Sequence, residues 1–387
     1  MPLHEKTLNR PPLPPTFAPP AAWTNRSLPA LRRALLAWFD AHRRPMPWRA
    51  SRDAYPIWVS EVMLQQTTVA AVVPFFERFL AAFPTVRHLA DADEQQVLHL
   101  WQGLGYYRRA RHLHAAAKRL VAGHGDALPD DPAVWAELPG VGRYILGAVM
   151  SQAFERKLPI VEANSLRVLA RWFASPLDPR AGVGQLWVWA AAAAVLPDAR
   201  IGDFNQALME LGATVCTPVA PRCGECPVAK WCEARRLGLQ ATIPPKPKAK
   251  VITNVVEVGV ILHDDRAVCL FQRRPDAQRW AGMWEVPHGE VAPGETLEEA
   301  ATRVALELTG FAVVLGDEVA TVRHGVTRYA ITLTGFTAQR RGGTFAAGHY
   351  AQCREVPATE LADYPMSTSQ RQLLAEWRRP GRPRRLF

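Results

Sequence analysis

The chain lacks the features of a membrane or secreted protein. None of its apolar runs reaches the length of a membrane-spanning helix, and the alanine-rich stretch at 190–195 is too short to cross a bilayer. Residues 1–25 are rich in proline and contain no hydrophobic signal core. These absences favour a cytoplasmic protein that uses no membrane partner. We expect residues 1–27 to be disordered.

Cysteine is scarce, and acidic residues are outnumbered by basic ones. Only six cysteines occur in 387 residues, and four of them lie within 216–232. In a chain without an export signal, such crowding indicates a metal site rather than disulfides.

The 46 Lys and Arg exceed the 36 Asp and Glu, giving a net charge of +10. This balance favours a polyanion such as nucleic acid, although an arginine-rich proteome encoded by GC-rich DNA would show it too.

The hydrophobic pattern changes once along the chain. Apolar residues at three- and four-residue spacing predict a helical domain of roughly ten helices over residues 28–240. Residues 241–254, rich in Pro and Lys, predict an extended linker. Alternating β-branched segments then predict an α+β domain over 255–376. The arginine-rich tail, 377–387, is either an electrostatic DNA contact or a solvated end. The predicted helices include Leu31–Phe39, Trp58–Val69, Val97–Trp101, Arg143–Phe154, Leu166–Phe173, Phe204–Leu211 and Leu297–Leu308, and the predicted strands are Val255–Leu262, Ala267–Gln272, Val319–Arg323 and Tyr329–Phe336.

The crowded cysteines have the spacing C-x6-C-x2-C-x5-C, formed by Cys216, Cys223, Cys226 and Cys232. Four thiolates on one short loop can enclose a tetrahedral zinc ion or an iron–sulfur cluster. Zinc sites usually pair two CxxC motifs, whereas this loop has one. Four unliganded core cysteines are improbable at this spacing.

The segment Leu138-Pro139-Gly140-Val141-Gly142 predicts a tight turn in front of a helix. Glycine lacks a Cβ, so another molecule can approach the backbone closely here, and the positive end of the helix dipole favours phosphate. Twenty residues later, Glu162 stands at the start of another helical run. This arrangement predicts a DNA-gripping hairpin followed by a carboxylate with a chemical role.

With hairpin, carboxylate and cysteine loop in this order, residues 28–239 resemble the helix-hairpin-helix DNA glycosylases of the endonuclease III superfamily. The likeness is strongest to the MutY family of adenine glycosylases, through Pro47–Arg49, Trp58–Thr67 and Gly103–Tyr107. A Nudix-like domain after the linker agrees with that family. The resemblance implies a [4Fe-4S] cluster on the four cysteines. It also implies a monomeric base-excision repair enzyme that flips adenine out of double-stranded DNA opposite 8-oxoguanine or guanine.

The resemblance assigns roles residue by residue. Glu61 would donate the proton to the leaving adenine, Glu162 would stabilise the sugar cation, and Asn164 would support Glu162. Arg49 would line the base pocket. The remaining DNA contacts would come from Leu64, Gln66 and Tyr106 as wedges in the duplex and from Gly140, Val141 and Gly142 on the backbone.

Two of these assignments have a physical argument of their own. Glu61 lies among the apolar residues Ile57, Trp58, Val62 and Leu64, and burial there would raise its pKa, as a general acid requires. The alternative is an exposed glutamate on the wet face of its helix. At position 144, family members that also cut the backbone carry a Schiff-base lysine, whereas this chain has Tyr144. We therefore predict a monofunctional glycosylase.

The chain departs from the family pattern at the second catalytic carboxylate and at the segment that reads the opposite base. Glu162 replaces the family aspartate in Val161-Glu162-Ala163-Asn164, which lengthens the acidic side chain by one methylene. Preserved activity, reduced activity and a changed lesion preference are all compatible with that change. The Phe-Ser-His signature that reads 8-oxoguanine aligns with Val326-Thr327-Arg328, so Thr327 and the preceding His324 are the candidates for opposite-base recognition.

The Nudix-like box is incomplete. Gly289, Glu295, Arg303, Glu307 and Gly310 keep its spacing, but Val304 and Leu308 replace carboxylates that would bind magnesium. We therefore expect a domain used for recognition rather than nucleotide hydrolysis. Two other functions remain open for the whole chain: a mismatch glycosylase for another base, such as thymine opposite guanine, and a lesion-binding protein with little catalysis.

Overall fold

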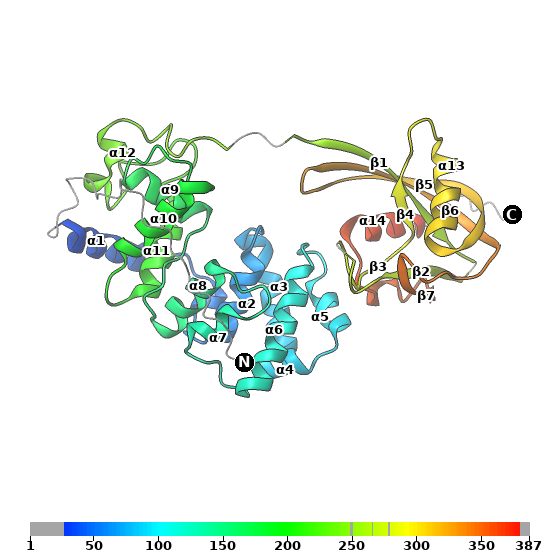
Figure 1. Cartoon of the computed structure of the whole chain (residues 1–387), viewed down its shortest axis with the longest axis horizontal. Helices are drawn as coiled ribbons and strands as arrows, with labels where there is room; N and C mark the ends of the chain where they lie inside the picture. The colour runs from blue at the N-terminus through cyan, green and yellow to red at the C-terminus, as the bar shows by residue number, and fades with distance from the viewer. Residues whose placement is uncertain (1–26, 248–250, 265, 278, 380–387) are drawn as a thin grey trace, which may run out of the picture. The chain divides into compact units, whose positions relative to one another are not determined.

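The computed structural model describes residues 27–247, 251–264, 266–277 and 279–379 (Figure 1). The predicted disordered start, apart from residue 27, lies outside these ranges, as do residues 248–250 of the predicted linker and 380–387 of the basic tail. No helix in the described ranges is long and apolar enough to cross a membrane. The chain forms two compact units, each of two segments: unit 1 is Met1–Gln66 with Ala122–Lys248, and unit 2 is Thr67–Val121 with Ala249–Phe387.

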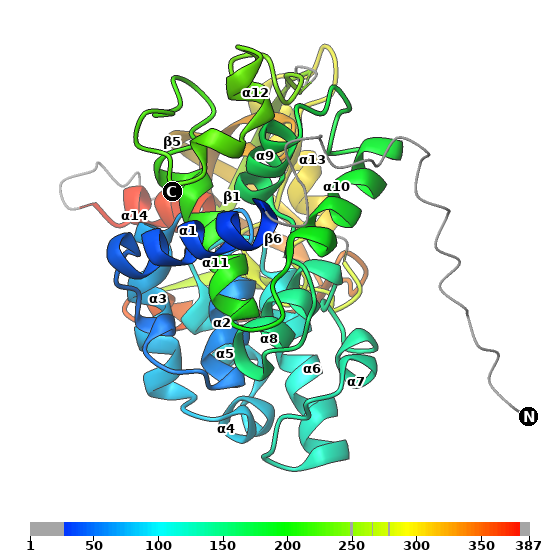
Figure 2. The ribbon, with the colours of Figure 1, turned by 90° about the vertical axis from the view of Figure 1, so that its left-hand side faces the viewer.

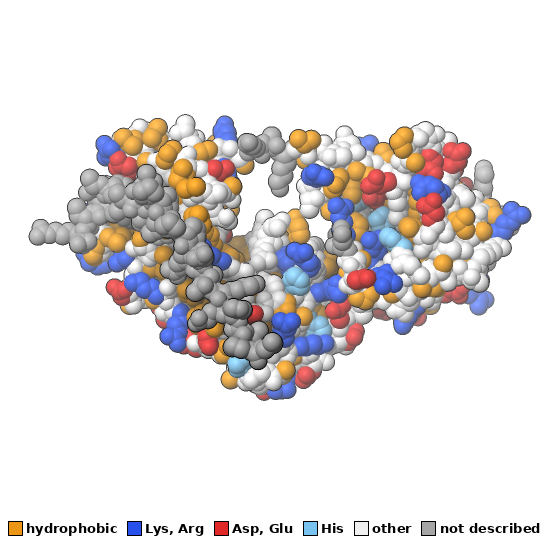
Figure 3. Space-filling model, viewed as in Figure 1, with side chains coloured by type: hydrophobic (Ala, Val, Ile, Leu, Met, Phe, Trp, Pro, Cys, Tyr) orange, Lys and Arg blue, Asp and Glu red, His pale blue; other side chains and the backbone are white. Residues whose placement is uncertain are grey.

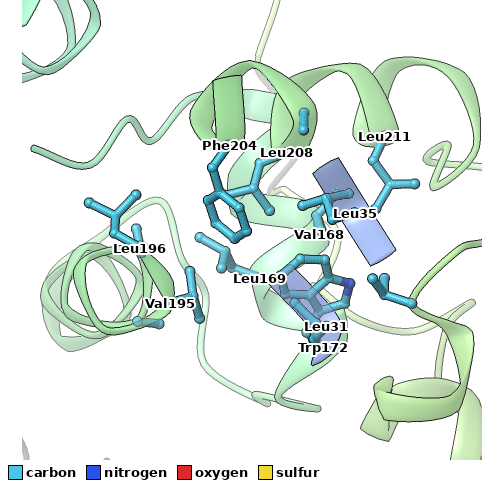
Figure 4. Close-up of a cluster of buried hydrophobic side chains, with 14 of the residues drawn as sticks. Leu31, Leu35, Val168, Leu169, Trp172, Val195, Leu196, Phe204, Leu208 and Leu211 are labelled. Atoms are coloured by element: carbon cyan, nitrogen blue, oxygen red, sulfur yellow. The ribbon is translucent and has the colours of Figure 1, made fainter. Parts of the chain in front are cut away.

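Unit 1 is helical. Its elements are α1 (Ser27–His42), η1 (Pro47–Arg49), α2 (Ala54–Leu64), α7 (Pro132–Ala136), α8 (Arg143–Phe154), α9 (Ala163–Trp172), α10 (Gly182–Val195), α11 (Ile201–Thr214), η2 (Ala229–Trp231) and α12 (Glu233–Arg236). Helices α1, α9, α10 and α11 share one hydrophobic core (Figures 2 and 4). Leu31, Leu35 and Phe39 of α1 enter it at four-residue spacing, which brings them to one face of the helix.

Helix α2 is buried on all sides. Asp53 caps its first turn by accepting a hydrogen bond from the Tyr55 backbone N–H at 3.0 Å, and Pro56 is tolerated in that turn because the amide there has no helical partner. Nine of its eleven residues are buried. A helix that is apolar all round packs inside a protein, so any polar side chain on it is held away from water.

Unit 2 contains the remaining helices and all the described strands. Its helical elements are α3 (Val69–Ala82), α4 (Val86–Asp91), α5 (Glu94–Trp101), most of α6 (Arg108–His124), α13 (Leu297–Thr309), η3 (Leu361–Asp363) and α14 (Thr368–Trp377). Its strands are β1 (Thr253–Leu262), β2 (Ala267–Arg273), β3 (Trp284–Glu285), β4 (His288–Glu290), β5 (Phe311–Val326), β6 (Tyr329–Gly343) and β7 (Tyr350–Pro357). This combination confirms the predicted α+β class of the C-terminal part.

The strands form two sheets, ordered β4-β1-β6-β5 and β3-β2-β7. Strands β1 and β6 are parallel, and the other pairs are antiparallel. Alternate residues of β1 serve two cores: Val258 and Val260 pack with α13, whereas Ile261 packs with α14. Gly335 on β6 leaves room for Leu373 of α14, because a Cβ at Gly335 would lie 2.3 Å from Leu373 Cδ1. The two helices therefore cover opposite faces of the larger sheet.

Several predicted elements differ from the structure. The C-terminal part of the predicted helix Trp58–Val69 is wrong. Helix α2 ends at Leu64, and Gln66 adopts a left-handed backbone conformation (φ +59°). Thr68 then caps α3. Residues 27–247 form twelve α-helices rather than ten. Strands β5 and β6 are much longer than predicted, and α14 was not among the predicted helices.

Candidate active site

Glu61 is the buried polar group of α2, with 3% of its surface exposed. The Tyr144 hydroxyl donates to Glu61 Oε2, and Gln152 Nε2 donates to Glu61 Oε1 at 2.8 Å. Burial raises the pKa of Glu61, although the two hydrogen bonds and the charge of Arg49 act in the opposite direction. The carboxyl therefore keeps a proton at higher pH than an exposed glutamate, and the alternative of a solvent-exposed Glu61 is excluded.

The charges of two carboxylates, Glu61 and Glu162, act on the Tyr144 hydroxyl. Burial raises its pKa well above the usual value, and the charges of Glu61 and Glu162 raise it further. Its position at the second residue of α8 turns the hydroxyl toward α2, which packs against α8. The phenol is thus a neutral hydrogen-bond donor at physiological pH.

Glu162 is the N-cap of α9. Its Oε1 accepts from the Ser165 backbone N–H at 2.7 Å, and its Oε2 accepts from the Asn164 backbone N–H at 2.8 Å. The Ser165 hydroxyl in turn accepts from the Glu162 N–H at 2.9 Å, which completes a capping box. Burial raises the pKa of Glu162, and the charge of Glu61 adds to that rise. The backbone N–H groups at the start of α9, rather than the length of the side chain, therefore fix the position of the Glu162 carboxylate.

Asn164 is held on both ends of its amide. Its Nδ2 donates to Glu162 Oε2 at 3.1 Å, and its Oδ1 accepts from Arg167 Nη2 at 2.8 Å. Arg167 also donates to the Gly212 carbonyl at 2.8 Å, in the helix packed against α9. This chain of contacts connects Glu162 to α11 and orients the amide toward the carboxylate.

A cavity of about 370 Å³ lies beside Glu61. Glu61 itself does not line it, but Gln152, which donates to Glu61, does. Trp48, Arg49 and Ile57 line the same space. The full lining also includes Asp40, Arg43, Ala50, Ser51, Arg52, Arg200, Gly202, Asp203 and Gln206. Most of this lining is polar or charged, so the cavity offers many hydrogen-bond donors and acceptors beside one aromatic ring, which suits a flat heterocycle with ring nitrogens.

Arg49 is held rigidly at the wall of this cavity. It donates from Nε to Gln206 Oε1 at 2.7 Å, from Nη2 to Glu210 Oε2 at 2.9 Å and from Nη1 to the Arg44 carbonyl at 2.9 Å. Glu210, 1% exposed, also pairs with Arg44 Nε at 2.5 Å. Burial alone would raise the pKa of Glu210, but the hydrogen bonds and charges of Arg44 and Arg49 lower it overall. The buried carboxylate thus pairs with two arginines, of which Arg49 lines the cavity.

The sequence reasoning missed Gln152, Gln206 and Glu210. Gln206 and Glu210 are four residues apart on α11, so they share one face of that helix. Their spacing was an available signal, although Asp203 and Asn205 on the same helix are polar too. Gln152 offered none, since its partner Glu61 is 91 residues away.

The predicted hairpin connects α7 to α8. Gly140 has φ +77°, a left-handed conformation that favours glycine, and Val141 N–H donates to the Leu138 carbonyl at 3.2 Å. Gly142 is the N-cap of α8 without a side-chain cap, and no heavy atom lies within 4 Å of the position that a Cβ would take. The exposed start of α8 therefore leaves its backbone N–H groups accessible.

The three predicted wedge residues differ in exposure. Leu64 is half-buried at the end of α2 in unit 1, and Gln66 is exposed just beyond it. Tyr106, in unit 2, is 48% exposed and has φ +49°. A left-handed backbone conformation costs energy in a residue other than glycine. Such strained residues are typical of functional turns.

The four clustered cysteines line a small cavity in unit 1. Arg171 Nη1 donates to Cys216 Sγ at 3.3 Å, and burial raises the pKa of the Cys232 thiol to about 11. Among the described residues, no three His, Cys, Asp or Glu side chains converge on a single ion position. The observation that supports a metal cluster on these cysteines is therefore the cavity that the four thiols share. Four cysteines around one cavity, with an arginine beside them, suit an iron–sulfur cluster of negative charge.

In unit 2, Thr327 and His324 occupy different environments. Thr327 is exposed at the turn between β5 and β6, with φ +55°. Both ring nitrogens of His324 are buried, and in the part of the chain that the structure describes they have no hydrogen-bond partner. Burial lowers the pKa of His324, so its ring is neutral. Thr327 is therefore the accessible member of the pair.

The Nudix-like box is occupied by internal ion pairs. Arg303 pairs with Glu295 at 2.7 Å and with Glu307 at 3.1 Å. Val304 is buried in the core that α13 forms with the sheet. The remaining carboxylates of the box, Glu295 and Glu307, thus form ion pairs with Arg303.

Three family profiles match the chain. "HhH-GPD superfamily base excision DNA repair protein" matches residues 59–183, "Iron-sulfur binding domain of endonuclease III" matches 216–232, and "NUDIX domain" matches 257–376. They confirm the helix-hairpin-helix fold, the iron–sulfur cysteine loop and the Nudix fold expected from the sequence. Cys216, Cys223, Cys226 and Cys232 are the residues that would hold the [4Fe-4S] cluster.

Curated relatives carry the name adenine DNA glycosylase. The Rattus norvegicus protein is 43% identical over 230 residues, which cover 56% of this chain and 45% of the relative. The Buchnera aphidicola protein (subsp. Acyrthosiphon pisum) is 34% identical over 254 residues, which cover 65% of this chain and 72% of the relative. The chain thus spans less than half the length of the mammalian relatives. A solved structure titled as a thermostable thymine-DNA glycosylase is 28% identical, with a TM-score of 0.51, and the match covers 55% of this chain and 98% of that one.

Proposed function

Because the chain belongs to the adenine DNA glycosylase family, we propose that it removes adenine from double-stranded DNA where the base is mispaired with 8-oxoguanine or guanine. The observation that carries this proposal is the buried Glu61, which accepts hydrogen bonds from Tyr144 and Gln152 beside a cavity that Gln152 and Arg49 line. We expect the protein to act as a monomer. Lys and Arg side chains lie on the surface of each unit (Figure 3), and positive surface charge suits a polyanion.

Glu61 is the general acid in this mechanism. Beside the cavity, the raised pKa of Glu61 keeps a proton on its carboxyl, and transfer of that proton to a ring nitrogen of the extruded adenine makes the base a neutral leaving group. Tyr144 and Gln152 fix the orientation of the carboxyl. Arg49, held by Gln206 and Glu210, fixes one wall of the cavity against which the base lies.

Glu162 stabilises the positive charge that develops on the sugar as the glycosidic bond breaks. Its carboxylate is already oriented by the α9 backbone, so little reorganisation accompanies the reaction. Asn164 keeps one of its oxygens in place. Since Tyr144 is a phenol, no amine attacks the sugar from that position, and the product is an intact strand with an abasic site.

The contacts with DNA come from elsewhere in the chain. The exposed backbone at Gly140, Val141 and Gly142 binds phosphate, and Leu64, Gln66 and Tyr106 fill the space that the extruded base leaves. Thr327, with its exposed hydroxyl, reads the opposite base. Cys216, Cys223, Cys226 and Cys232 would hold the iron–sulfur cluster, which when bound would keep the cysteine loop in shape.

Base release from a panel of duplexes tests this proposal. We expect adenine release opposite 8-oxoguanine and guanine, faster opposite 8-oxoguanine, with no adduct trapped by borohydride. Equal rates for the two pairs would remove the oxidised-base readout from the proposal.

Thymine opposite guanine is the second candidate substrate, because a structural neighbour is a thymine-DNA glycosylase. Preferential thymine release in the same panel would select it, and binding without release of any base would select a lesion-binding protein.

A further inference from the structure

The C-terminal α+β part of the chain is hydrogen-bonded to the turn that carries Tyr106. Both belong to unit 2. Met366, in the loop before α14, is held at both of its backbone groups: its N–H donates to Gln102 Oε1 at 2.9 Å, and its carbonyl accepts from the Tyr107 hydroxyl at 3.1 Å. Gln102 and Tyr107 flank the turn Gly103–Tyr106 on either side. One residue of the C-terminal part thus connects the two ends of the turn.

The contact between Tyr107 and Met366 is buried, and the contact with Gln102 is partly buried. Met366 is 1% exposed and Tyr107 is 6% exposed. The Tyr107 hydroxyl also accepts from the Gly103 N–H at 3.4 Å, so it joins the turn itself to the Met366 carbonyl. A buried carbonyl or N–H that loses its partner costs more than an exposed one, because water cannot replace the missing hydrogen bond.

A second pair of hydrogen bonds joins the same two segments at α5. Gln95 Nε2 donates to the Gly282 carbonyl at 3.0 Å, and Gln95 Oε1 accepts from Trp284 Nε1 at 3.1 Å. A Cβ at Gly282 would lie 3.3 Å from Glu94 Oε1, so the backbone approaches α5 closely at this point. The C-terminal part is thus held by two pairs of hydrogen bonds, one at Gln95 and one at Met366. These bonds restrict its rotation relative to α5 and the turn.

One residue of the turn, the non-glycine Tyr106, is under backbone strain. Gly103 and Gly105 have φ values of +107° and +72°, and Tyr106 follows at +49°. Trp101 Nε1 donates to the Gly105 carbonyl at 3.2 Å, and Arg109 donates to the Leu104 carbonyl at 3.3 Å. Such a conformation persists only where surrounding contacts define it, and Met366 supplies contacts at both ends.

We propose that Gln102 and Tyr107 are positioning residues through which the C-terminal part fixes the Gly103–Tyr106 turn, so that this part supports base extrusion as well as reading the opposite base. This inference rests on the proposed function, because it takes Tyr106 as the side chain that enters the duplex. Loss of the Met366 contacts leaves the turn free to relax and slows the entry of Tyr106 into the stack.

The test measures extrusion separately from catalysis. The full-length protein is mixed with a duplex that holds adenine opposite 8-oxoguanine and 2-aminopurine beside the adenine. The rise in 2-aminopurine fluorescence reports unstacking, and free adenine is measured in parallel. The variants are Tyr107→Phe, Gln102→Met, which removes the acceptor, and Gln102→Glu, which retains it. Tyr364→Phe is the matched control, since it removes a hydroxyl from the same loop while its ring can stay on Trp284, 5.1 Å away between centroids.

We expect Tyr107→Phe and Gln102→Met to slow the fluorescence rise about tenfold, in line with one or two buried groups left unpaired. Gln102→Glu and Tyr364→Phe should match the wild type, and a duplex with adenine opposite an abasic-site analogue, where extrusion is easier, should show less than a twofold effect. Unchanged rates for both disabling variants, or equal slowing on the two duplexes, would overturn the inference. A normal fluorescence rise without adenine release would instead count against the proposed function alone.

Discussion

Replacing Glu162 with aspartate or glutamine tests how the second carboxylate acts. In the structure its two oxygens accept backbone N–H bonds from Asn164 and Ser165 at 2.8 and 2.7 Å. Aspartate is itself among the preferred N-cap residues and can accept from the same N–H groups. The carboxylate would then stay near its present position even though the side chain is one methylene shorter.

The magnitudes for the two variants differ greatly. For Glu162→Asp we expect a change in single-turnover rate of less than about tenfold, because a misplacement near 1 Å costs on the order of 100-fold and the cap limits the displacement. The free energy of unfolding should change by less than about 1 kcal/mol, since the cap is kept. Glu162→Gln removes the charge. A unit charge about 4 Å from a developing cation is worth about 4 kcal/mol at an effective dielectric constant of 20, which corresponds to roughly a thousandfold loss in rate.

Adenine release under single-turnover conditions, with enzyme in excess over duplex, measures both variants directly. Glu299→Gln is the matched control, because it neutralises a capping-box carboxylate on α13 in unit 2 and should leave the rate unchanged. A Glu162→Asp protein more than 100-fold faster than the wild type would show that the glutamate is misplaced. Near-normal release by Glu162→Gln would show that the charge has no part in the chemistry.

Three further predictions follow from buried charges. Since burial raises the pKa of Glu61, the release rate should fall as pH rises through that pKa; it should also fall as pH drops through the pKa of Glu162, whose carboxylate must be ionised, and a rate that climbs steadily with pH would contradict this. Glu210→Gln should slow adenine release about 10- to 100-fold and lower the denaturant midpoint, because breaking a buried pair costs about 3–5 kcal/mol, and an unchanged rate would remove Arg49 from the pocket wall. Although burial by itself lowers the pKa of His288, Glu285 and Glu257 raise it to about 10, so its stabilisation is complete below the unfolded pKa of about 6.5 and is lost as pH rises from there to about 10. The difference in melting temperature between wild type and His288→Asn should shrink across that window, and a difference that grows would refute the assignment.

Local patterns in the sequence predicted the parts of the fold that depend on neighbouring residues. Arg143–Phe154 was predicted with the bounds that α8 has, because a glycine turn precedes it and its apolar residues keep helical spacing. The apolar neighbours of Glu61 left burial and exposure both open, and the structure shows that the side chain is buried. The break between α2 and α3 was missed, since Gln66 enters a left-handed conformation that its residue type does not announce.

Contacts between distant residues could not be predicted from spacing. Gln152 reaches Glu61 across 91 residues, and Tyr107 reaches Met366 across 259. Strands β5 and β6 extend beyond their hydrophobic patterns because each pairs with the other, so the ladder, rather than the alternation in either strand, sets their length. The roles of the site residues stay predictions until they are measured.

Adenine release by the full-length protein and its Glu61→Gln variant tests the central claim most directly. On a duplex with adenine opposite 8-oxoguanine, we expect the wild type to yield free adenine and an intact strand with an abasic site. The variant, which keeps an acceptor for Tyr144 but has no carboxyl proton, should release at least about 100-fold less adenine. Equal release by the two proteins, or release of thymine opposite guanine with adenine left in place, would contradict the account.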